Sequence, residues 1–281
     1  MSFLAQPGAV AESGDGRQDT PIVFDDVAIA FEDNVVLDGV SFTLPRGEMK
    51  ILLGIAGSGK STLLNLALGL MQPDRGHIWV LGRDVTRMKE QDLFALRSRI
   101  GMVFQESALF DSLTVKENVA YRLVEDHALS EEEITRRVRE ALRFVELEHT
   151  LTMFPSELSG GMRRRVAIAR AIVTEPEVLL YDSPTGGLDP ITSTTIIELL
   201  LKQRDVYHTS ALMVTHRLQD AYLTATHCFD KKLNRMVPNS TEATSEVKTT
   251  FLILRDGKVI FDGDAAELIR ERDPYIREYI A

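Results

Sequence analysis

The residues with the clearest chemistry lie in one glycine-rich segment, residues 54–61, with the sequence GIAGSGKS. Glycines let backbone N–H groups converge on an anion at the start of a helix, where the helix dipole also favours negative charge. Lys60 adds a positive charge, and the Ser61 hydroxyl is an oxygen ligand suited to Mg²⁺. A strand pattern precedes the segment and a helical pattern follows it, as a phosphate-binding loop requires. The residues expected to hold the phosphates are Gly54, Gly57, Ser58, Gly59, Lys60, Ser61 and Thr62.

Two other segments have the composition of metal or phosphate sites. Residues 178–182, VLLYD, form a predicted apolar strand that ends in a carboxylate, the group with which phosphate-loop ATPases hold Mg²⁺. Residues 158–162, LSGGM, precede a helical stretch at 163–172, so free N–H groups lie beside the Ser159 hydroxyl. The sequence therefore predicts Asp182 as a magnesium residue and a second phosphate-binding surface at Ser159.

Strand and helix patterns alternate around these segments, which favours a mainly parallel sheet. The predicted strands cover residues 22–30, 40–44, 50–53, 78–81, 100–104, 178–181 and 211–215. Helices are predicted after Gly59 and at 192–203. Residues 106–156 are polar and helical in pattern, with Ser130 and Glu133 placed as a capping box before the helix at 134–145, and they indicate an inserted helical subdomain.

The two ends of the chain have weaker patterns. Residues 231–247 contain few large apolar side chains, so we expect a surface insertion. Strand patterns at 251–254 and 259–261 flank the dipeptide Asp256-Gly257, which predicts a hairpin, and a helical tail is expected at 271–281. Residues 1–20 lack a basic start followed by an apolar core, so we expect a disordered arm rather than a secretion signal.

The composition limits the class of protein. With 44% hydrophobic and 26% charged residues, the chain has the composition of a soluble globular protein with a sizeable core. Its net charge of -10 disfavours nucleic acid as a partner, although the arginines at 163–165 could form a local basic patch. The lone Cys228 permits no intrachain disulfide, and no apolar run approaches the roughly 18–20 residues that cross a bilayer. We expect a cytoplasmic chain whose membrane role depends on a partner.

The order of these motifs, from residue 22 onward, resembles that of the ATP-binding subunits of ABC transporters. The resemblance implies an α/β fold: a phosphate-loop NTPase core with a mainly parallel sheet, an antiparallel β subdomain and an inserted helical subdomain at about 106–157. These parts would form one domain over residues 21–270, which includes the surface insertion at about 231–247, and a C-terminal helical tail would follow at 271–281. The resemblance also implies ATP and Mg²⁺ as ligands.

Within that resemblance, three residues surround the bound nucleotide. Phe31 would stack on adenine, Gln105 would contact Mg²⁺ and sense a membrane partner, and His216 would hold the γ-phosphate. Ser61 and Asp182 would complete the magnesium site. Each assignment has a structural alternative, because Phe31 could be a strand core residue, and Gln105 and His216 taken alone are ordinary loop residues.

The resemblance assigns a second set of residues to the ATP of an opposite subunit. Ser159, Gly160 and Gly161 would contact its γ-phosphate, and Asp189 would lie in the loop at 187–189 that links the two sites. The expected partners are a second copy of this chain, or a similar ATPase subunit, and an integral membrane permease. Such a permease would hold the chain on the inner face of the cell membrane.

The chain departs from the family pattern at Ser183, where most ABC ATPases carry a glutamate that polarises the attacking water. Serine cannot serve as that base, and a positioned general base contributes roughly 10²- to 10⁴-fold in rate. Either hydrolysis is slow, or another group, such as His216 or a residue of a partner, positions the water. Met162, where glutamine is common, removes no essential donor.

A narrower resemblance, to the ATPases of Mla-type phospholipid transport systems that work with MCE-domain proteins, comes from residues 101–110, 118–121 and 158–162. It implies an ATPase that drives lipid movement across the envelope and docks on its permease near residues 105–121. The alternative is an ATP-gated clamp or regulatory module that hydrolyses slowly because of Ser183. A soluble ABC protein of DNA repair or translation fits less well, because the chain is acidic and carries one cassette.

Overall fold

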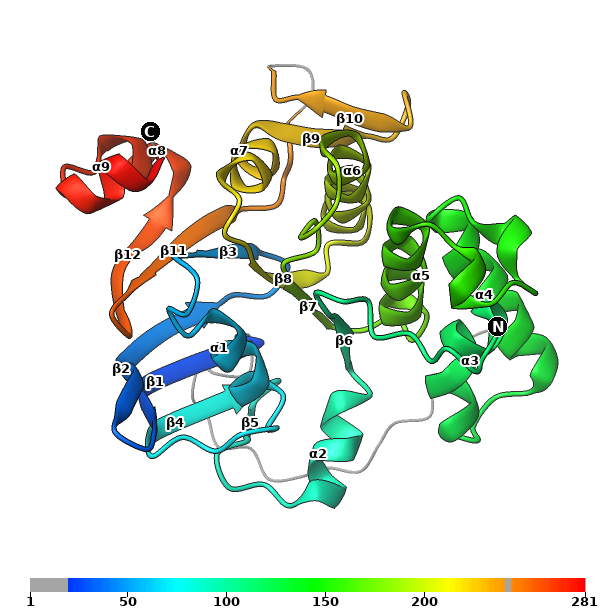
Figure 1. Ribbon diagram of the computed structural model, residues 1–281, viewed down its shortest axis with the longest axis horizontal. Coiled ribbons are helices and arrows are strands. Elements are labelled where there is room, and N and C mark those ends of the chain that lie inside the picture. Colours follow the sequence, from blue (N-terminus) through cyan, green and yellow to red (C-terminus); the bar gives the residue numbers. More distant parts are fainter. Residues whose placement is uncertain (1–19, 241–243, 281) are drawn as a thin grey trace.

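The structure is a computed structural model that describes residues 20–240 and 244–280. Its first sheet is antiparallel, with the strand order β2-β1-β4-β5. The strands of this sheet are β1 (Ile22–Phe31), β2 (Asn34–Leu44), β4 (Arg75–Val80) and β5 (Arg83–Asp84). It lies at one end of the molecule, against the central sheet (Figure 1). The expected antiparallel β subdomain is therefore confirmed.

The central sheet has six strands in the order β12-β11-β3-β8-β7-β6. They are β3 (Met49–Leu53), β6 (Ile100–Val103), β7 (Val178–Asp182), β8 (Ser210–Val214), β11 (Thr249–Arg255) and β12 (Lys258–Asp264). β12 pairs antiparallel with β11, while the other neighbours are parallel, so the predicted mainly parallel sheet is confirmed. The β11–β12 turn has positive φ at Asp256 and Gly257, 49° and 73°, as the predicted hairpin requires.

Successive residues of the central strands face two different hydrophobic cores. In β3, Ile51 and Leu53 belong to one core and Leu52 to the other, because side chains alternate across a strand. The core around Leu52 joins the central sheet, the antiparallel sheet and α1 (Lys60–Ala67), whose Leu63 and Leu64 are fully buried. Burial on both faces explains why these strands are continuous apolar runs in the sequence.

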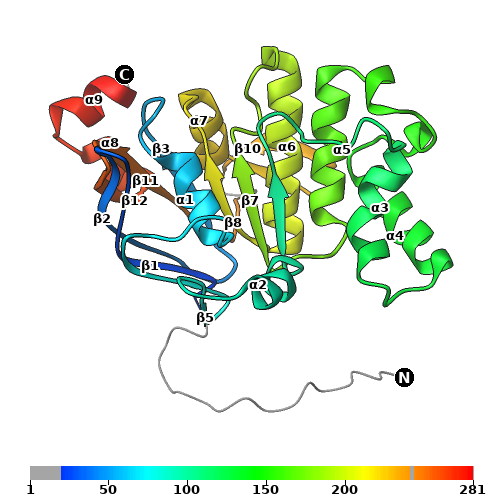
Figure 2. The ribbon, with the colours of Figure 1, turned by 60° about the horizontal axis from the view of Figure 1, so that its bottom comes forward.

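The other core joins the central sheet to a group of helices. α5 (Gly160–Ile172) and α6 (Pro190–Tyr207) pack on the sheet, and α3 (Val115–Glu125) and α4 (Glu131–Phe144) stand beyond α5, at the opposite end from β1 and β2 (Figure 2). The other helical segments are α2 (Glu90–Arg97), α7 (Leu218–Thr226), α8 (Ala265–Arg270), α9 (Pro274–Ile280) and two 3-10 turns, Glu148–Thr150 and Pro155–Glu157. Across residues 20–240 and 244–280, no helix combines the length and the hydropathy needed to cross a membrane.

The predicted capping box at α4 is only half correct. Ser130 caps the helix by accepting a hydrogen bond from the Glu133 backbone N–H at 3.3 Å. The Glu133 carboxylate, however, pairs with Arg136 and Arg137 rather than with the Ser130 backbone, because guanidinium groups one turn along the helix are stronger partners than a neutral N–H. Complete capping boxes occur at the starts of α3 and α8; the one at α3 has the expected sequence pattern, Thr114 followed by Glu117, which we did not single out from the sequence.

The segment expected as a surface insertion, residues 231–247, contains a strand that the sequence did not predict. β10 (Arg235–Pro238) pairs antiparallel with β9 (His227–Asp230). Residues 241–243 lie outside the described part of the chain, as do residues 1–19 of the arm expected at 1–20.

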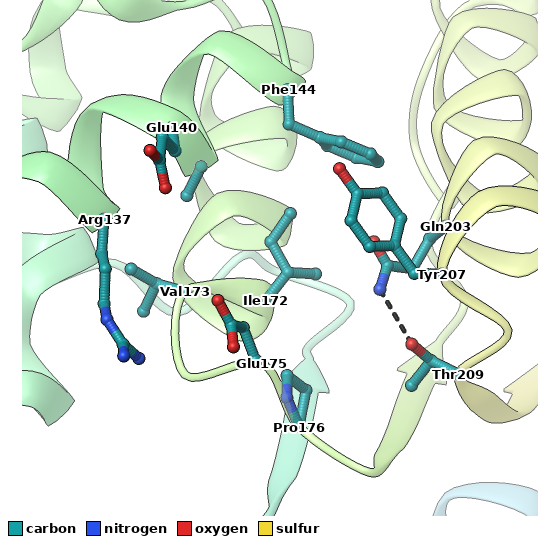
Figure 3. A pocket seen from close by; sticks show the side chains of 11 residues that line it. Arg137, Glu140, Phe144, Ile172, Val173, Glu175, Pro176, Gln203, Tyr207 and Thr209 are labelled. Atoms are coloured by element: carbon teal, nitrogen blue, oxygen red, sulfur yellow. Dashed lines mark hydrogen bonds between the residues drawn. The ribbon is translucent and has the colours of Figure 1, made fainter. Parts of the chain in front are cut away.

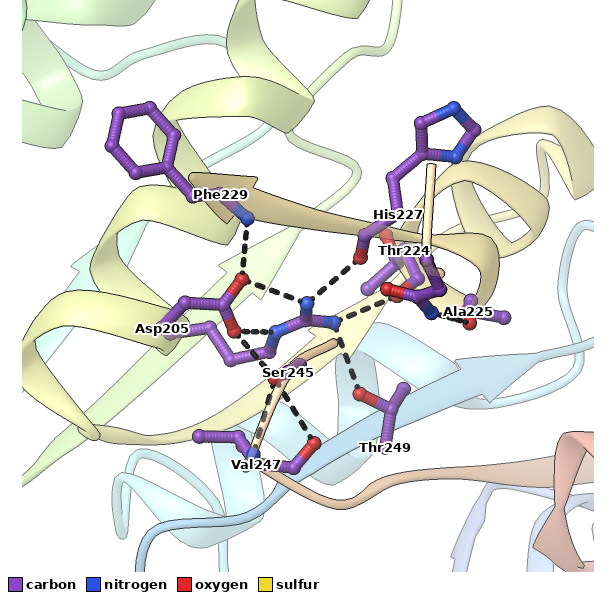
Figure 4. A network of polar contacts seen from close by, with 10 residues as sticks. Asp205, Thr224, Ala225, His227, Phe229, Ser245, Val247 and Thr249 are labelled. Atoms are coloured by element: carbon purple, nitrogen blue, oxygen red, sulfur yellow. Dashed lines mark hydrogen bonds and ion pairs between the residues drawn. The ribbon is translucent and has the colours of Figure 1, made fainter. Parts of the chain in front are cut away.

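A buried ion pair between neighbouring residues ties this hairpin to the core. The Arg204 and Asp205 side chains are joined at 2.6 Å. The Asp205 carboxylate also accepts hydrogen bonds from the Phe229 N–H at 2.8 Å and from the Ser245 hydroxyl at 2.6 Å, while Arg204 donates to the His227 carbonyl at 2.9 Å (Figure 4). Because both charges are partnered several times, their burial is tolerated and both ends of the segment are fixed on α6.

Candidate functional site

The predicted phosphate-binding residues form the turn between β3 and the start of α1. Gly59 caps α1 with φ of 93°, and a Cβ there would lie 2.8 Å from Leu37 Cδ2 of β2, so the position requires glycine. Because glycine has no side chain, this cap makes no side-chain hydrogen bond to the first backbone N–H groups of α1. The first turn of α1 also contains no acidic residue. The backbone N–H groups at the start of α1 are therefore available to an anion, which the helix dipole also attracts.

The Lys60 side chain folds back over this loop. Its ammonium group donates to the Gly54 and Ile55 carbonyls at 2.8 and 2.7 Å and lies 3.2 Å from the Ser58 hydroxyl oxygen. Burial lowers the pKa of the Lys60 ammonium, and the negative charge of Asp182 partly opposes that effect. A desolvated cation gains more from an incoming phosphate than an exposed one, because fewer water contacts are lost.

Three neighbouring strands bring functional residues to one edge of the central sheet. β3, β8 and β7 run parallel, so their carboxyl ends meet. Asp182 ends β7 and lies opposite Val214 of β8, and His216 follows two residues after that strand. The Thr215 N–H donates to the Leu52 carbonyl at 3.1 Å, which ties the end of β8 to the strand before the phosphate loop. The structure thus brings residues 54–61, Asp182 and His216 together.

Ser183 follows Asp182 at the same edge and is buried, with 6% of its surface exposed. Its φ of 45° lies in the left-handed region, which is strained for a residue other than glycine, and its N–H donates to the Val214 carbonyl at 2.9 Å. The Ser183 hydroxyl is 3.4 Å from an Asp182 carboxylate oxygen, to which it donates. The position where the family resemblance led us to expect a glutamate therefore presents a hydroxyl beside the predicted magnesium carboxylate.

Gln105 lies in the segment after β6, which is the neighbour of β7, and so belongs to the same edge. Its side chain is exposed. Its main chain is anchored by Arg164 of α5, whose guanidinium donates to the Phe104 carbonyl at 2.9 Å and to the Gln105 carbonyl. Arg164 is only 4% exposed, so it does not add to the basic surface patch that residues 163–165 left possible.

Ser159, Gly160 and Gly161 form the start of α5, which packs on the start of α6. The Ser159 hydroxyl accepts a hydrogen bond from the Met162 N–H at 3.3 Å, so it caps the helix. A Cβ on Gly161 would lie 2.4 Å from Thr192 Cγ2 of α6, which makes glycine necessary for this close packing. The described first turn of α5 has no acidic residue, and Ser159 and Gly160 are exposed, so this helix start is a second place where an anion could bind.

Phe31 and Asp189 are both on the surface. Phe31 ends β1 and is 45% exposed, which excludes the alternative of a strand core residue. Asp189 caps α6, and its carboxylate accepts hydrogen bonds from the Ile191 and Thr192 N–H groups at 3.0 Å each. The Thr192 hydroxyl also donates to this carboxylate. This bond is the largest cause of the lowered pKa of Asp189, and the backbone hydrogen bonds add to it. Both residues are accessible to a ligand or to a second chain.

Two contacts at this edge could not be predicted from the sequence. The hydroxyl of Tyr279 in α9 accepts a hydrogen bond from the Gly54 N–H at 3.2 Å, although the two residues are 225 positions apart. Asp220 of α7, which is 1% exposed, accepts hydrogen bonds from the side chains of Thr185 and Thr215. It thereby fixes the loops that follow β7 and β8. Neither residue belongs to a short motif, so only the fold reveals its place.

The predicted magnesium residues offer oxygen ligands only: the Ser61 hydroxyl, the Asp182 carboxylate and the Gln105 amide. These donors suit Mg²⁺, which usually keeps waters and substrate phosphate oxygens as its other ligands. Within residues 20–240 and 244–280, no group of three or more His, Cys, Asp and Glu side chains could hold a metal ion by itself. The donor set therefore fits a Mg²⁺ ion that enters with a nucleotide.

A separate cavity of about 330 Å³ lies between α4 and the ends of α5 and α6 (Figure 3). Apolar side chains such as Phe144 and Ile172 line it together with charged ones such as Arg137 and Glu175. None of the predicted nucleotide or metal residues lines this cavity. We therefore place the nucleotide at the sheet edge, where Lys60 and a free helix start match the charge of phosphates.

A mainly parallel sheet with a glycine-rich loop before a helix, and a carboxylate at the end of a neighbouring strand, defines a phosphate-loop nucleotide-binding protein. Residues 37–186 match the family model described as ABC transporter. The chain belongs to this family and is one of its ATP-hydrolysing cassettes.

The relatives cover most of the chain. It is 38% identical to Protein TRIGALACTOSYLDIACYLGLYCEROL 3, chloroplastic, of Arabidopsis thaliana, over 90% of this chain and 71% of that protein. It is 32% identical to the Escherichia coli intermembrane phospholipid transport system ATP-binding protein MlaF, over 91% of this chain and 86% of that protein. The methionine import ATP-binding protein MetN of Bifidobacterium longum is 42% identical, over 65% of this chain and 45% of that protein.

A solved structure has the same fold. It is a dimeric, post-hydrolysis state of an ATP-binding cassette bound to ADP and Pi, which is 29% identical to this chain. The two structures superpose with a TM-score of 0.72, over 86% of this chain and 98% of that one. The expected fold class is therefore confirmed.

Proposed function

We propose that this chain powers an ABC transporter for a phospholipid or another lipid, and that it works as a dimer on the inner face of the cell membrane. The observation that supports the lipid class is the extent of similarity. Two relatives that are named after a lipid match 90% and 91% of this chain, whereas the methionine import relative matches 65% of it. The greater length of these two matches favours a lipid over an amino acid as the transported substrate.

In this proposal the edge of the central sheet binds ATP. The N–H groups at the start of α1 and the Lys60 ammonium hold the phosphates, and Phe31 stacks on adenine. Ser61, Asp182 and Gln105 hold Mg²⁺, which neutralises charge on the phosphates during hydrolysis. His216, exposed at the end of β8, holds the γ-phosphate.

The start of α5 completes the site of the other subunit. It is exposed and free of acidic residues, so it attracts a phosphate, and its Ser159 hydroxyl supplies a hydrogen-bond partner. The dimeric solved relative, bound to ADP and Pi, supports a second copy as the partner. Asp189, exposed at the start of α6 beside Gly161, would lie between the two sites.

A groove beside the Gln105 segment suits a membrane permease. Its volume is about 450 Å³, and Phe104, Phe110, Tyr121 and Arg122 are among the residues that line it. Phe110 and Tyr121 are 44% and 43% exposed, and their rings are 4.7 Å apart. Exposed aromatic side chains around a groove are typical of sites that receive a helix of a partner. A permease helix bound here would lie next to Gln105.

Isolation of the chain from membranes, followed by identification of its partners, tests the lipid assignment. We expect a permease together with an MCE-domain protein. Recovery with a periplasmic sugar or amino-acid binding protein would contradict the lipid class, and recovery with nucleic acid would contradict the transporter assignment as a whole.

A second candidate function rests on Ser183. A buried hydroxyl replaces the usual base, which favours an ATP-gated clamp that closes for a long time and hydrolyses slowly. We expect Ser183→Glu to raise the ATPase rate by roughly 10²-fold or more, and the matched control Ser183→Ala to leave the rate near that of the native chain. A fast native rate that Ser183→Glu does not change would show that another group positions the water.

A further inference from the structure

Two arginines of α5 hold the segment that carries Gln105, which we define as the Gln105 loop, residues 104–108. Arg164 donates to the Phe104 and Gln105 carbonyls, and Arg170 donates to the Ser107 and Ala108 carbonyls at 2.9 and 2.7 Å. Ser107 and Ala108 have φ of 66° and 47°, so this part of the loop has a strained backbone that needs support. The Gln105 loop is thus attached to α5 along its length.

Arg164 differs from Arg170 in one respect. Its guanidinium also donates to the Gly186 carbonyl at 3.3 Å, which lies in the loop between Ser183 and the start of α6. The Arg164 side chain therefore contacts the main chain of two loops at once, while Arg170 holds one. A planar guanidinium with several N–H groups in a fixed arrangement can make such a bridge, and a lysine ammonium can replace it only in part.

The burial of Arg164 indicates that this bridge has a desolvation cost. Only 4% of the residue is exposed, and its Nε has no hydrogen-bond partner among the described residues. Burial lowers the pKa of the Arg164 guanidinium, and the nearby charges of Glu106 and Asp182 oppose this effect. A methionine would fill a similar volume without this desolvation cost, but it could not donate to the carbonyls of the two loops, so the guanidinium is explained by the loops that it joins.

We infer that Arg164 is a positioning residue that makes three segments move as one unit: the start of α5, the Gln105 loop and the loop from Gly186 to Asp189. Each segment carries a residue assigned to ATP or to the second subunit, namely Ser159, Gln105 and Asp189. Arg164 itself contacts none of the reacting atoms. The Gln105 loop borders the permease groove. When it is displaced, the start of α5 and the loop from Gly186 to Asp189, which are both assigned to the second subunit, are displaced with it. This inference rests on the proposed function.

The test compares Arg164→Met with the matched control Arg170→Met, which removes the same kind of bonds from the same loop and helix. In the purified full chain without Mg²⁺, we expect both variants to keep the native affinity for a fluorescent ATP analogue, because residues 54–61 are untouched and Gln105 is assigned to the metal. ATP-driven dimerisation, followed by light scattering, should weaken about tenfold in Arg164→Met and less than about threefold in Arg170→Met. Arg164→Lys should recover part of the loss.

Amide hydrogen exchange in the nucleotide-free chain provides a second readout that does not depend on dimerisation. In Arg164→Met we expect faster exchange in both the Gln105 loop and residues 186–189, and in Arg170→Met only in the Gln105 loop. Unchanged exchange at 186–189 in a folded Arg164→Met, or equal dimerisation losses in the two variants, would overturn the inference. A native chain that binds ATP but forms no dimer would instead contradict the proposed function, while the exchange comparison still decides the role of Arg164.

Discussion

The starts of α1 and α5 are both glycine-rich, both lack acidic residues in the first turn, and yet they are built differently. At α1, Gly59 adopts a left-handed conformation, no side chain of the cap bonds the helix, and Lys60 supplies a positive charge within the loop. At α5, Ser159 caps the helix with its own hydroxyl. The first start thus has charge and free donors of its own, while the second offers a hydroxyl and a helix dipole.

Under the proposed function, this difference gives the two helix starts different roles in a site shared by two chains. A phosphate at α1 gains a cation, free N–H groups and a neighbouring magnesium carboxylate, so the start of α1 can bind a nucleotide in a single chain. A phosphate at α5 gains only weaker, neutral contacts, which are enough to close a second chain over a nucleotide that is already bound. In contrast, the first turn of α4 contains three glutamates, whose negative charges already interact with the positive end of the helix dipole and would repel a phosphate.

The largest expected effect separates the two helix starts. Lys60→Ala should weaken ATP binding by the purified chain by about 100-fold, because charge-assisted bonds to a desolvated phosphate are lost. Ser159→Ala should leave the affinity of the single chain within about twofold, because its hydroxyl serves the other subunit. Titration with a fluorescent ATP analogue measures both. Equal losses in the two variants would remove the distinction between a primary and a closing site.

A smaller effect is expected at the contact between α9 and the start of the phosphate loop. Tyr279→Phe removes the acceptor of the Gly54 N–H, and the loss of one neutral hydrogen bond should lower ATP affinity about threefold. Tyr275→Phe in the same helix is the matched control, because the Tyr275 hydroxyl has no hydrogen-bond partner within the part of the chain that the structure describes. The same titration checks both, and a loss in Tyr275→Phe alone would contradict the account of this contact.

The smallest effect is expected at the start of α4. Hydrogen bonds from Arg136, the larger cause, and from Arg137 lower the pKa of Glu133 from its ordinary 4.5 to about 2. Because the folded value is the lower one, these pairs stabilise the fold above about pH 4.5, and their contribution is lost as the pH falls toward 2. Glu133→Gln should therefore lower Tm slightly at pH 7, and the difference from the native chain should shrink over that range.

Thermal unfolding across this pH range checks the Glu133 prediction. Glu132→Gln keeps the Glu133 pairs and is the control, so its difference from the native chain should not follow the same course. A Glu133→Gln difference that stays constant from pH 7 down to pH 3 would show that the ion pairs add nothing to stability, as many exposed pairs do not.

The elements that local patterns specify were predictable, and the contacts between distant segments were not. β3, β7 and β8 are short apolar runs because they are buried on both faces, and the glycine-rich loop between β3 and α1 has a fixed spacing. β10 escaped prediction because none of its residues is buried and their pattern is that of a loop. The capping box at α4 was wrong in one bond because Arg136 and Arg137 compete for the same carboxylate.

Arg164 shows the limit most clearly. In the sequence it is the middle of three arginines, which left a local basic surface patch possible. In the structure the helical period turns its neighbours Arg163 and Arg165 to other partners, Leu158 and Val145, and directs Arg164 at the Gln105 loop. The carbonyls that fix its position come from loops, whose conformations no local pattern specifies.

The most direct test of the shared site mixes two inactive variants. Lys60→Ala removes the cation of the phosphate loop, and Gly160→Glu places a negative charge at the start of α5, while the control Gly160→Ala fits because its Cβ would lie 3.8 Å from the nearest side chain, Leu188. We expect neither variant alone to trap ATP in a dimer. In a mixed dimer, the intact loop of the Gly160→Glu chain meets the intact α5 of the Lys60→Ala chain, so nucleotide trapping should return at one of the two sites. A mixture that traps no more ATP than the separate variants would contradict a site built from two chains.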